Sequence, residues 1–221
     1  NIFHVTGDLN DEVPTATLTL NNVKLYTDTW AGVQVGSKGL LEYELKFKGI
    51  KAHSSNPAKG KSANMNAVKF LSELDAFYEE KIKTFKEKSY EVPYTTMNVG
   101  LINGGSAKNS VPANSDVFVD FRIANKSHIS IIKEKIEELA KKYDCEIDII
   151  ECIEPFIDKS ELVTEIKTAN FITEASFIEG SNRIILGTGP VTAHEVNEYI
   201  TEESYNKLVE QYKVLIMKVC K

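Results

Sequence analysis

The chain has 221 residues, of which 42% are hydrophobic and 26% charged, and its formal net charge is −6. This composition argues against intrinsic disorder and a disulfide-stapled fold, and the lack of a basic stripe argues against nucleic acid as a partner. The three cysteines form no CxxC pair, which is typical of proteins of the reducing cytoplasm. No apolar run reaches the ~18 residues of a membrane-spanning helix, so we expect no membrane partner.

The first part of the chain is expected to form β-strands separated by turns. Apolar runs bounded by Asn, Asp, Gly and Pro predict strands at residues 2–5, 17–20, 23–26 and 33–35. Residues 40–49 then alternate apolar and polar side chains, as a half-buried strand does. From about Ser62 the apolar residues recur every three or four positions, which predicts an amphipathic helix beginning there.

Two further strands are expected after this helix. Residues 94–104 and 111–124 are rich in β-branched and aromatic residues and predict a strand pair. The loop between them contains Gly104 and Gly105, and glycines allow a tight turn and a close approach of the backbone to a ligand.

A second helix and a closing strand complete this part of the chain. Residues 127–143 predict an amphipathic helix with Ser127 as its N-cap, and residues 145–152 predict a strand. Residues 42–153 therefore follow the order strand–helix–strand–strand–helix–strand, the split βαβ arrangement of a ferredoxin-like domain.

The flanking pieces, residues 1–41 and 154–221, are expected to form a second domain into which the first is inserted. The later piece predicts a helix near residues 160–169, a strand at 183–187 and a terminal helix from about residue 202. That alternation favours an α/β layer, which makes the chain an α/β protein. The flanks total about 110 residues, which is short for a catalytic α/β domain of the usual ~150.

His194 is one of four histidines and lies in a glycine-rich segment after the predicted strand at 183–187. Ligands of α/β proteins bind beyond the carboxyl ends of strands, so His194 is a candidate metal ligand. A surface histidine in a loop is the alternative, because zinc enzymes require three or more protein ligands.

Three other polar residues are candidates for substrate chemistry. His53 lies between a strand and a helix, where it is either a polar loop residue or a hydrogen-bond donor near a reacting carbonyl. Asn109 follows the glycine loop, and Arg122 interrupts an apolar strand. The Arg122 guanidinium could bind a carboxylate bidentately or form a structural ion pair with Asp120 or Glu44.

These segments together resemble one enzyme family. "KGLLEYELKFKGIKAHSSNPAKGKSA", "YTTMNVGLINGGSAKNSVPANSDVFVDFR", "ITEASFIEG" and "LGTGPVTAHEVNEYI" occur in the order and near the spacing of the acetylornithine deacetylase, succinyl-diaminopimelate desuccinylase and carboxypeptidase G family. The resemblance covers roughly residues 33–221 and is closest to the acetylornithine deacetylase branch. It implies a partial zinc-peptidase-like α/β catalytic domain with an inserted ferredoxin-like lid that also forms a homodimer.

The resemblance also implies cofactors and roles. A complete active site of this family holds two zinc ions, for which cobalt can substitute, and His194 would be the last zinc ligand. His53 would reach from the lid of the partner subunit and stabilise the tetrahedral oxyanion. Ser62 stands where the family has Asn, and as a helix cap it is a mild replacement.

Substrate binding would fall to residues of both domains. By the resemblance, Asn109 and Arg122 would bind the substrate's carboxylate or backbone, while Gly187, Thr188 and Gly189 would line the pocket. The substrate would be an N-acyl amino acid or a peptide, and the implied role is in amino-acid biosynthesis.

The remaining family ligands are missing from the first 40 residues, which contain no HxD and no Glu-Glu pair. In one alignment Thr27 takes the position of a glutamate ligand, with Asp28 one residue away as a candidate metal ligand. In the other, Asp8 replaces the first histidine ligand. Both leave the di-metal site incomplete.

Three explanations of the missing ligands stay open. The chain is part of a longer enzyme, it is a degenerate paralogue that has lost catalysis, or it binds one metal weakly. The abrupt start within a predicted strand and the short flanks favour the first. We therefore predict a cytoplasmic, zinc-dependent hydrolase, a deacetylase or metallopeptidase, that removes an acetyl or succinyl group from an N-acyl amino acid. The alternative is a catalytically incomplete homodimeric module that retains only the lid.

Overall fold

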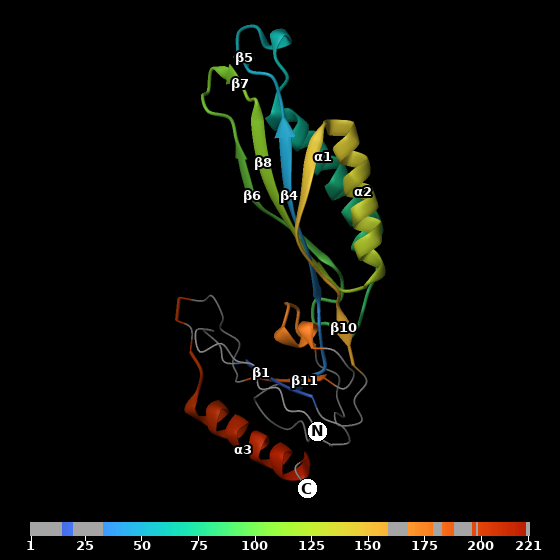
Figure 1. The fold of residues 1–221 in the computed structure, drawn as a ribbon, viewed down its shortest axis with the longest axis vertical. Helices are drawn as coiled ribbons and strands as arrows, with labels where there is room; N and C mark the ends of the chain where they lie inside the picture. Colours follow the sequence, from blue (N-terminus) through green and yellow to red (C-terminus); the bar gives the residue numbers. More distant parts are fainter. Residues whose placement is uncertain are drawn as a thin grey trace. The chain divides into compact units, whose positions relative to one another are not determined.

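The computed structural model describes residues 15–19, 33–158, 168–178, 183–187, 196–197 and 199–219. It divides into two compact units (Figure 1). The first unit comprises residues 1–37, 89–91 and 156–221, and the second comprises residues 38–88 and 92–155. No helix in the described part of the chain is long and apolar enough to cross a membrane.

The second unit is a four-stranded antiparallel sheet covered on one face by two helices (Figure 1). Its elements are β4 (Gly39–Lys48), α1 (Ala63–Phe77), β6 (Thr96–Gly104), β8 (Asn114–Ile123), α2 (Ser127–Tyr143) and β9 (Cys145–Ile153). The strands lie in the order β6-β8-β4-β9. This order is the ferredoxin-like topology that the sequence predicts, so the predicted fold class is confirmed.

Alternating burial along β4 and β8 places one row of apolar side chains under the helices. Leu41, Tyr43, Leu45 and Phe47 of β4 are all at most 1% exposed. Phe70 of α1 is fully buried against this row, and its ring meets the Phe47 ring edge-on at 5.4 Å between centroids. The apolar side chains that recur every second residue in the strands and about every 3.6 residues in the helices therefore pack into one core.

The two helices begin with different caps. The Ser62 hydroxyl accepts a hydrogen bond from the Met65 amide at 3.2 Å, so the predicted cap of α1 is confirmed. The predicted Ser127 cap of α2 is wrong, because Ser127 is already helical and Lys126 precedes it in the cap position. The Asn125 side-chain carbonyl instead accepts from the Ser127 amide at 2.9 Å. An Asx side chain two residues earlier therefore takes the role expected of the serine.

A small two-stranded sheet continues the antiparallel pair of β4 and β8. β5 (Ala52–His53) pairs with β7 (Ser110–Val111), and a short 3₁₀ turn, η1 (Pro57–Lys59), follows β5. In Figure 1 this sheet lies at the end of the second unit reached by the carboxyl end of β4. The sequence pattern did not reveal it, since two-residue strands carry no periodicity.

The first unit contains a three-stranded antiparallel sheet in the order β1-β11-β2. Its strands are β1 (Thr15–Thr19), β11 (Arg183–Gly187) and β2 (Val33–Gln34), and a separate pair joins β3 (Gly36–Ser37) to β10 (Phe156–Ile157). A 3₁₀ turn, η3 (Glu174–Phe177), and the terminal helix α3 (Glu202–Val219) complete it. Among the predicted elements, the strands at 2–5 and 23–26 lie outside the described residues. The predicted helix at 160–169 is described only at its end, where Ala169 forms a β-bridge to Ser37.

Residues 89–91 belong to the first unit although they lie within the predicted lid. Tyr90 is 2% exposed, and its hydroxyl donates to the Ser37 carbonyl at 3.0 Å. The chain therefore passes between the units four times, not twice as in a simple insertion. The second unit also begins at Lys38 and ends at Pro155, slightly outside the predicted range 42–153.

Candidate functional site

His53 and Asn109 come together through the β5–β7 pair. His53 lies opposite Ser110 in this pair, and the Ser54 amide donates to the Asn109 carbonyl at 3.0 Å. Both side chains are exposed. Two residues that are 56 positions apart in the sequence are thus held on one rigid extension of the second unit.

The local hydrogen bonds determine which ring nitrogen of His53 carries the proton. The Ser55 amide donates to His53 Nδ1 at 3.2 Å, and the Ser55 hydroxyl lies 2.7 Å from the same atom. Because a backbone N–H can only donate, Nδ1 must be the acceptor in the neutral ring. The proton of neutral His53 therefore lies on Nε2, which leaves an N–H donor free to face a ligand.

Arg122 lies at the other end of the sheet. Its register partners are Leu40 of β4 and Thr96 of β6. Arg122 is eight positions along β8 from Asn114, where the strand begins on the side of Asn109. At ~3.4 Å per residue this is roughly 27 Å, so Arg122 and Asn109 cannot contact the same small ligand within one copy of the chain.

The Arg122 guanidinium forms a two-point ion pair with Asp120. Nε lies 3.1 Å from Oδ1 and Nη2 lies 2.9 Å from Oδ2, with both side chains partly exposed. The structural alternative raised by the sequence is therefore present. A carboxylate ligand of Arg122 would have to share the guanidinium with Asp120 or displace it.

The two loop glycines have different reasons to be glycine. A Cβ on Gly104 would lie 2.1 Å from Asn64 Oδ1 and 2.7 Å from Ser115 Oγ, so the strand could not approach α1 as closely. Gly105 has φ of +82°, a region that L side chains rarely adopt. The predicted tight turn is present at Gly105, whereas Gly104 is required for packing.

The candidate residues of the first unit lie at or beyond the end of β11 and near residue 28. Gly187 ends β11, and an added Cβ would meet no atom of the described residues within 4 Å. Thr188, Gly189, His194 and Asp28 lie outside the described residues. Their roles as pocket residues and metal ligands therefore stay predictions.

Sequence reasoning missed a charge cluster in the first unit. Arg183, read only as the start of a strand, binds the Asp158 carboxylate through Nε and Nη2, both at 3.0 Å. Its Nη1 donates to the carbonyls of Ala175 and Ile178 in and after η3, and its guanidinium stacks on the Phe156 ring at 3.6 Å. The sequence signal that could have revealed this cluster is Arg183 itself, a cation at the first position of an otherwise apolar strand. This arginine fixes the "TEASF" turn to β10 and β11.

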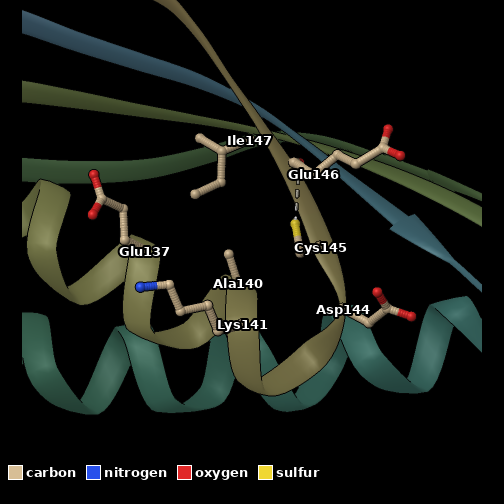
Figure 2. Close-up of a pocket in the computed structure, with 7 residues that line it drawn as sticks. All are labelled: Glu137, Ala140, Lys141, Asp144, Cys145, Glu146 and Ile147. Atoms are coloured by element: carbon tan, nitrogen blue, oxygen red, sulfur yellow. Dashed lines mark hydrogen bonds between the residues drawn. The ribbon is translucent and has the colours of Figure 1, made fainter.

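One surface pocket, of about 440 Å³, lies between the end of α2 and the start of β9 (Figure 2). It is lined by Glu137, Ala140, Lys141, Asp144, Cys145, Glu146 and Ile147. Burial raises the pKa of the Cys145 thiol to about 12, and this thiol donates to the Glu146 carbonyl, as the dashed line shows. Asp144 is held by the Lys61 ammonium at 2.7 Å. The Cys145 thiol is therefore a poor nucleophile, and the Asp144 carboxylate is already paired.

No metal centre can be assembled from the described residues. In that part of the chain, no three His, Cys, Asp or Glu side chains are placed to hold a metal ion together. The described residues therefore do not fit a zinc site on their own, and a metal would need ligands from the rest of the chain or from a longer protein.

Comparisons with known proteins identify the family. A family model described as "Peptidase dimerisation domain" matches residues 35–148, which is about half of the chain. The chain belongs to this peptidase dimerisation domain family. The resemblance recognised in the sequence is thereby confirmed, and the proteins that the chain is similar to are named as hydrolases of amide bonds.

Among curated proteins, the chain is 26% identical over 206 residues to acetylornithine deacetylase of Aliivibrio fischeri. It is also 26% identical over 208 residues to that of Vibrio atlanticus. Each match covers 84% of this chain and 54% of the relative. The chain thus spans about half the length of these relatives.

Solved structures share the fold. A tripeptidase from Staphylococcus aureus has a TM-score of 0.67 at 23% identity, covering 85% of this chain and 53% of that one. Aminopeptidase PepT from Bacillus cereus has a TM-score of 0.58 at 22% identity, covering 89% and 56%.

Proposed function

We propose that this chain is part of a metal-dependent amidohydrolase that removes an acetyl or succinyl group from an N-acyl amino acid. Membership of the peptidase dimerisation domain family and similarity to acetylornithine deacetylases support this reaction class. The observation that carries it is the hydrogen bond from the Ser55 amide to Nδ1 of the exposed His53, which in the neutral ring places the N–H on Nε2.

In this proposal His53 acts as a hydrogen-bond donor at the reacting carbonyl. When water adds to an amide, negative charge develops on the carbonyl oxygen, and a positioned N–H stabilises that charge. The Ser55 amide on Nδ1 keeps the donor on the opposite side of the ring and limits ring rotation. The Asn109 amide would add a second donor.

The enzyme is proposed to act as a homodimer that pairs through β6. Both β6 and β9 are edge strands of the sheet. β9 carries three acidic residues, which guard an edge against pairing, whereas β6 contains no charged residue. Leu101 and Ile102 of β6 are 56% and 61% exposed. Burial of such an apolar edge by a second copy is favourable.

A dimer also resolves the separation of the substrate-binding candidates. His53 and Asn109 lie beyond the Asn114 end of β8, whereas Arg122 lies roughly 27 Å from Asn114 along the strand. We propose that one active site receives His53 and Asn109 from one copy and Arg122, with the metal ligand His194, from the other. Zinc as the metal, with Asp28 as a further ligand, belongs to the same proposal.

Mixed dimers test this arrangement. Inactive His53→Ala and His194→Ala forms of the whole enzyme that contains this chain are combined, and hydrolysis of N-acetylornithine is measured. Random pairing gives half mixed dimers with one intact site of two, so about a quarter of the wild-type activity should return. The matched control combines His53→Ala with His53→Gln, which restores nothing.

Two results would count against the proposal. No recovery in the mixed dimers means that one site does not draw on both copies. If the whole protein that contains this chain dimerises but binds no metal and hydrolyses no N-acyl amino acid, the non-catalytic module is indicated instead.

A further inference from the structure

The end of the second unit that carries His53 is strongly basic. We define the tip surface as residues 50–61 and 104–111, which contain four lysines, one histidine and no acidic residue. The whole chain, in contrast, has a net charge of −6. Positive charge concentrated on one small surface of an acidic protein favours a partner of opposite charge.

The segments of the tip surface form one body. β5 pairs with β7, and the Ser54 amide binds the Asn109 carbonyl. The turn after η1 packs against β5, since a Cβ on Gly60 would lie 2.8 Å from the Ala52 Cβ. Lys108 lies in the turn directly before Asn109, where the Ser110 amide binds the Ala107 carbonyl at 3.3 Å. The backbone segments that carry the lysines are therefore held next to the segment that carries His53.

Most of this charge is not neutralised. Lys61 forms an ion pair with Asp144 at 2.7 Å. Lys51, Lys59 and Lys108 are exposed, and none of the residues that the structure describes forms an ion pair with them. Three ammonium groups thus accompany the Nε2–H of His53, and within the described residues no carboxylate competes for them.

Such a surface attracts a carboxylate and repels an ammonium group. An ammonium near a carboxylate gains a charge-assisted hydrogen bond, which is stronger than a neutral one. A cationic side chain of the substrate is not attracted, because the charged side chains of the tip surface are all positive and the neighbouring Asp144 carboxylate is already paired with Lys61. The part of the substrate that reaches the tip surface should therefore be anionic.

We propose that the tip surface binds a carboxylate group of the substrate, with Lys108 as the principal cation. This inference rests on the proposed function, because it takes His53 to stand at the reacting carbonyl. Lys108 is chosen because it adjoins Asn109, whose backbone is bonded to the His53 loop. The carboxylate has two possible sources: the far end of a dicarboxylic acyl group such as succinyl, or the α-carboxylate of the amino acid.

Four ligands separate these sources: N-succinylornithine, N-acetylornithine and the α-amide of each. Hydrolysis gives kcat/KM, and calorimetry gives Kd, for the wild-type chain and for Lys108→Gln. Loss of one exposed charge pair should weaken the ligands that bear the recognised carboxylate by about fivefold. An acyl carboxylate predicts this loss for the two succinyl ligands, and an α-carboxylate predicts it for the two free acids.

Two further variants serve as controls. Lys108→Arg keeps the charge and should retain selectivity, while Lys69→Gln removes an exposed lysine from the middle of α1 and should change nothing. Because the contact is exposed, the Lys108→Gln effect should also shrink at high salt.

The outcomes also distinguish this inference from the proposed function. If the ligands are hydrolysed and Lys108→Gln changes kcat/KM and Kd equally for all four, or changes neither, the carboxylate site is overturned and the proposed reaction stands. Carboxylate-dependent binding without hydrolysis supports the site and counts against the reaction. If the wild-type protein binds none of the four ligands, both the carboxylate site and the proposed reaction are overturned.

Discussion

Replacing Phe70 by alanine should destabilise the second unit by about 4 kcal/mol. The Phe70 side chain is 0% exposed, and its ring packs edge-on against Phe47 at 5.4 Å and Tyr143 at 6.4 Å. The alanine variant buries about 150 Å² less apolar surface on folding, which at ~25 cal/mol per Å² gives ~4 kcal/mol. This agrees with the ~3–5 kcal/mol typical of buried Phe→Ala changes.

Hydrogen exchange of α1 is the appropriate assay, because a chain of two units is not expected to unfold in a single two-state step. Amides of Ala63–Phe77 should exchange faster by roughly the factor that 4 kcal/mol implies, about a thousandfold for bonds that open with the unit. Replacing the exposed neighbour Lys69 by alanine should change the free energy of opening, as measured by exchange, by less than ~0.5 kcal/mol. Equal protection in Phe70→Ala and Lys69→Ala would refute the assignment of Phe70 to the core.

Buried polar groups give three further predictions. Burial lowers the pKa of His128, whose Nδ1 lies 2.8 Å from the Thr95 hydroxyl. Folding therefore favours the neutral ring, and the free energy of unfolding should fall as the pH drops below the unfolded value of about 6.5. His128→Gln should abolish that dependence in acid unfolding curves, and an unchanged slope would contradict it. Cys145, with its pKa raised to about 12, should react with a thiol reagent at pH 7.5 at least ~100-fold more slowly than exposed Cys152, as judged by peptide mass spectrometry. Asp158→Ala should destabilise the first unit by about 3 kcal/mol, since it leaves a largely buried guanidinium without its carboxylate; a thermal unfolding shift near zero would contradict this.

The strand and helix positions of the second unit were predictable because each element buries one face. The i, i+2 pattern of residues 40–49 matches β4 to within one residue at each end. The i, i+3/i+4 pattern begins at about Ser62, one residue before α1. The α2 cap was mispredicted, since serine at 127 and asparagine at 125 have equal local preference for capping. Only the geometry of the preceding turn decides between them.

The candidate site was less predictable than the fold. The sequence predicted His53 as a catalytic residue supplied by the partner subunit and Asn109 and Arg122 as substrate-binding residues, because all three belong to motifs of one family. Their distribution over the two ends of β8 follows from strand length and register, which set how far apart two motifs on the same strand lie. The ion pair of Arg122 with Asp120 was an open alternative in the sequence and is present in the structure.

The sequence by itself determined the family, the ferredoxin-like order of the inserted domain and the residue types available for chemistry. These depend on local periodicity and on motifs that are contiguous in the chain. The tertiary structure decided the tautomer of His53, the joining of residues 89–91 to the first unit, and the collection of lysines from two loops on one surface. Each of these depends on backbone hydrogen bonds and packing in three dimensions, most of them between segments far apart in the sequence, which a reading along the chain does not contain.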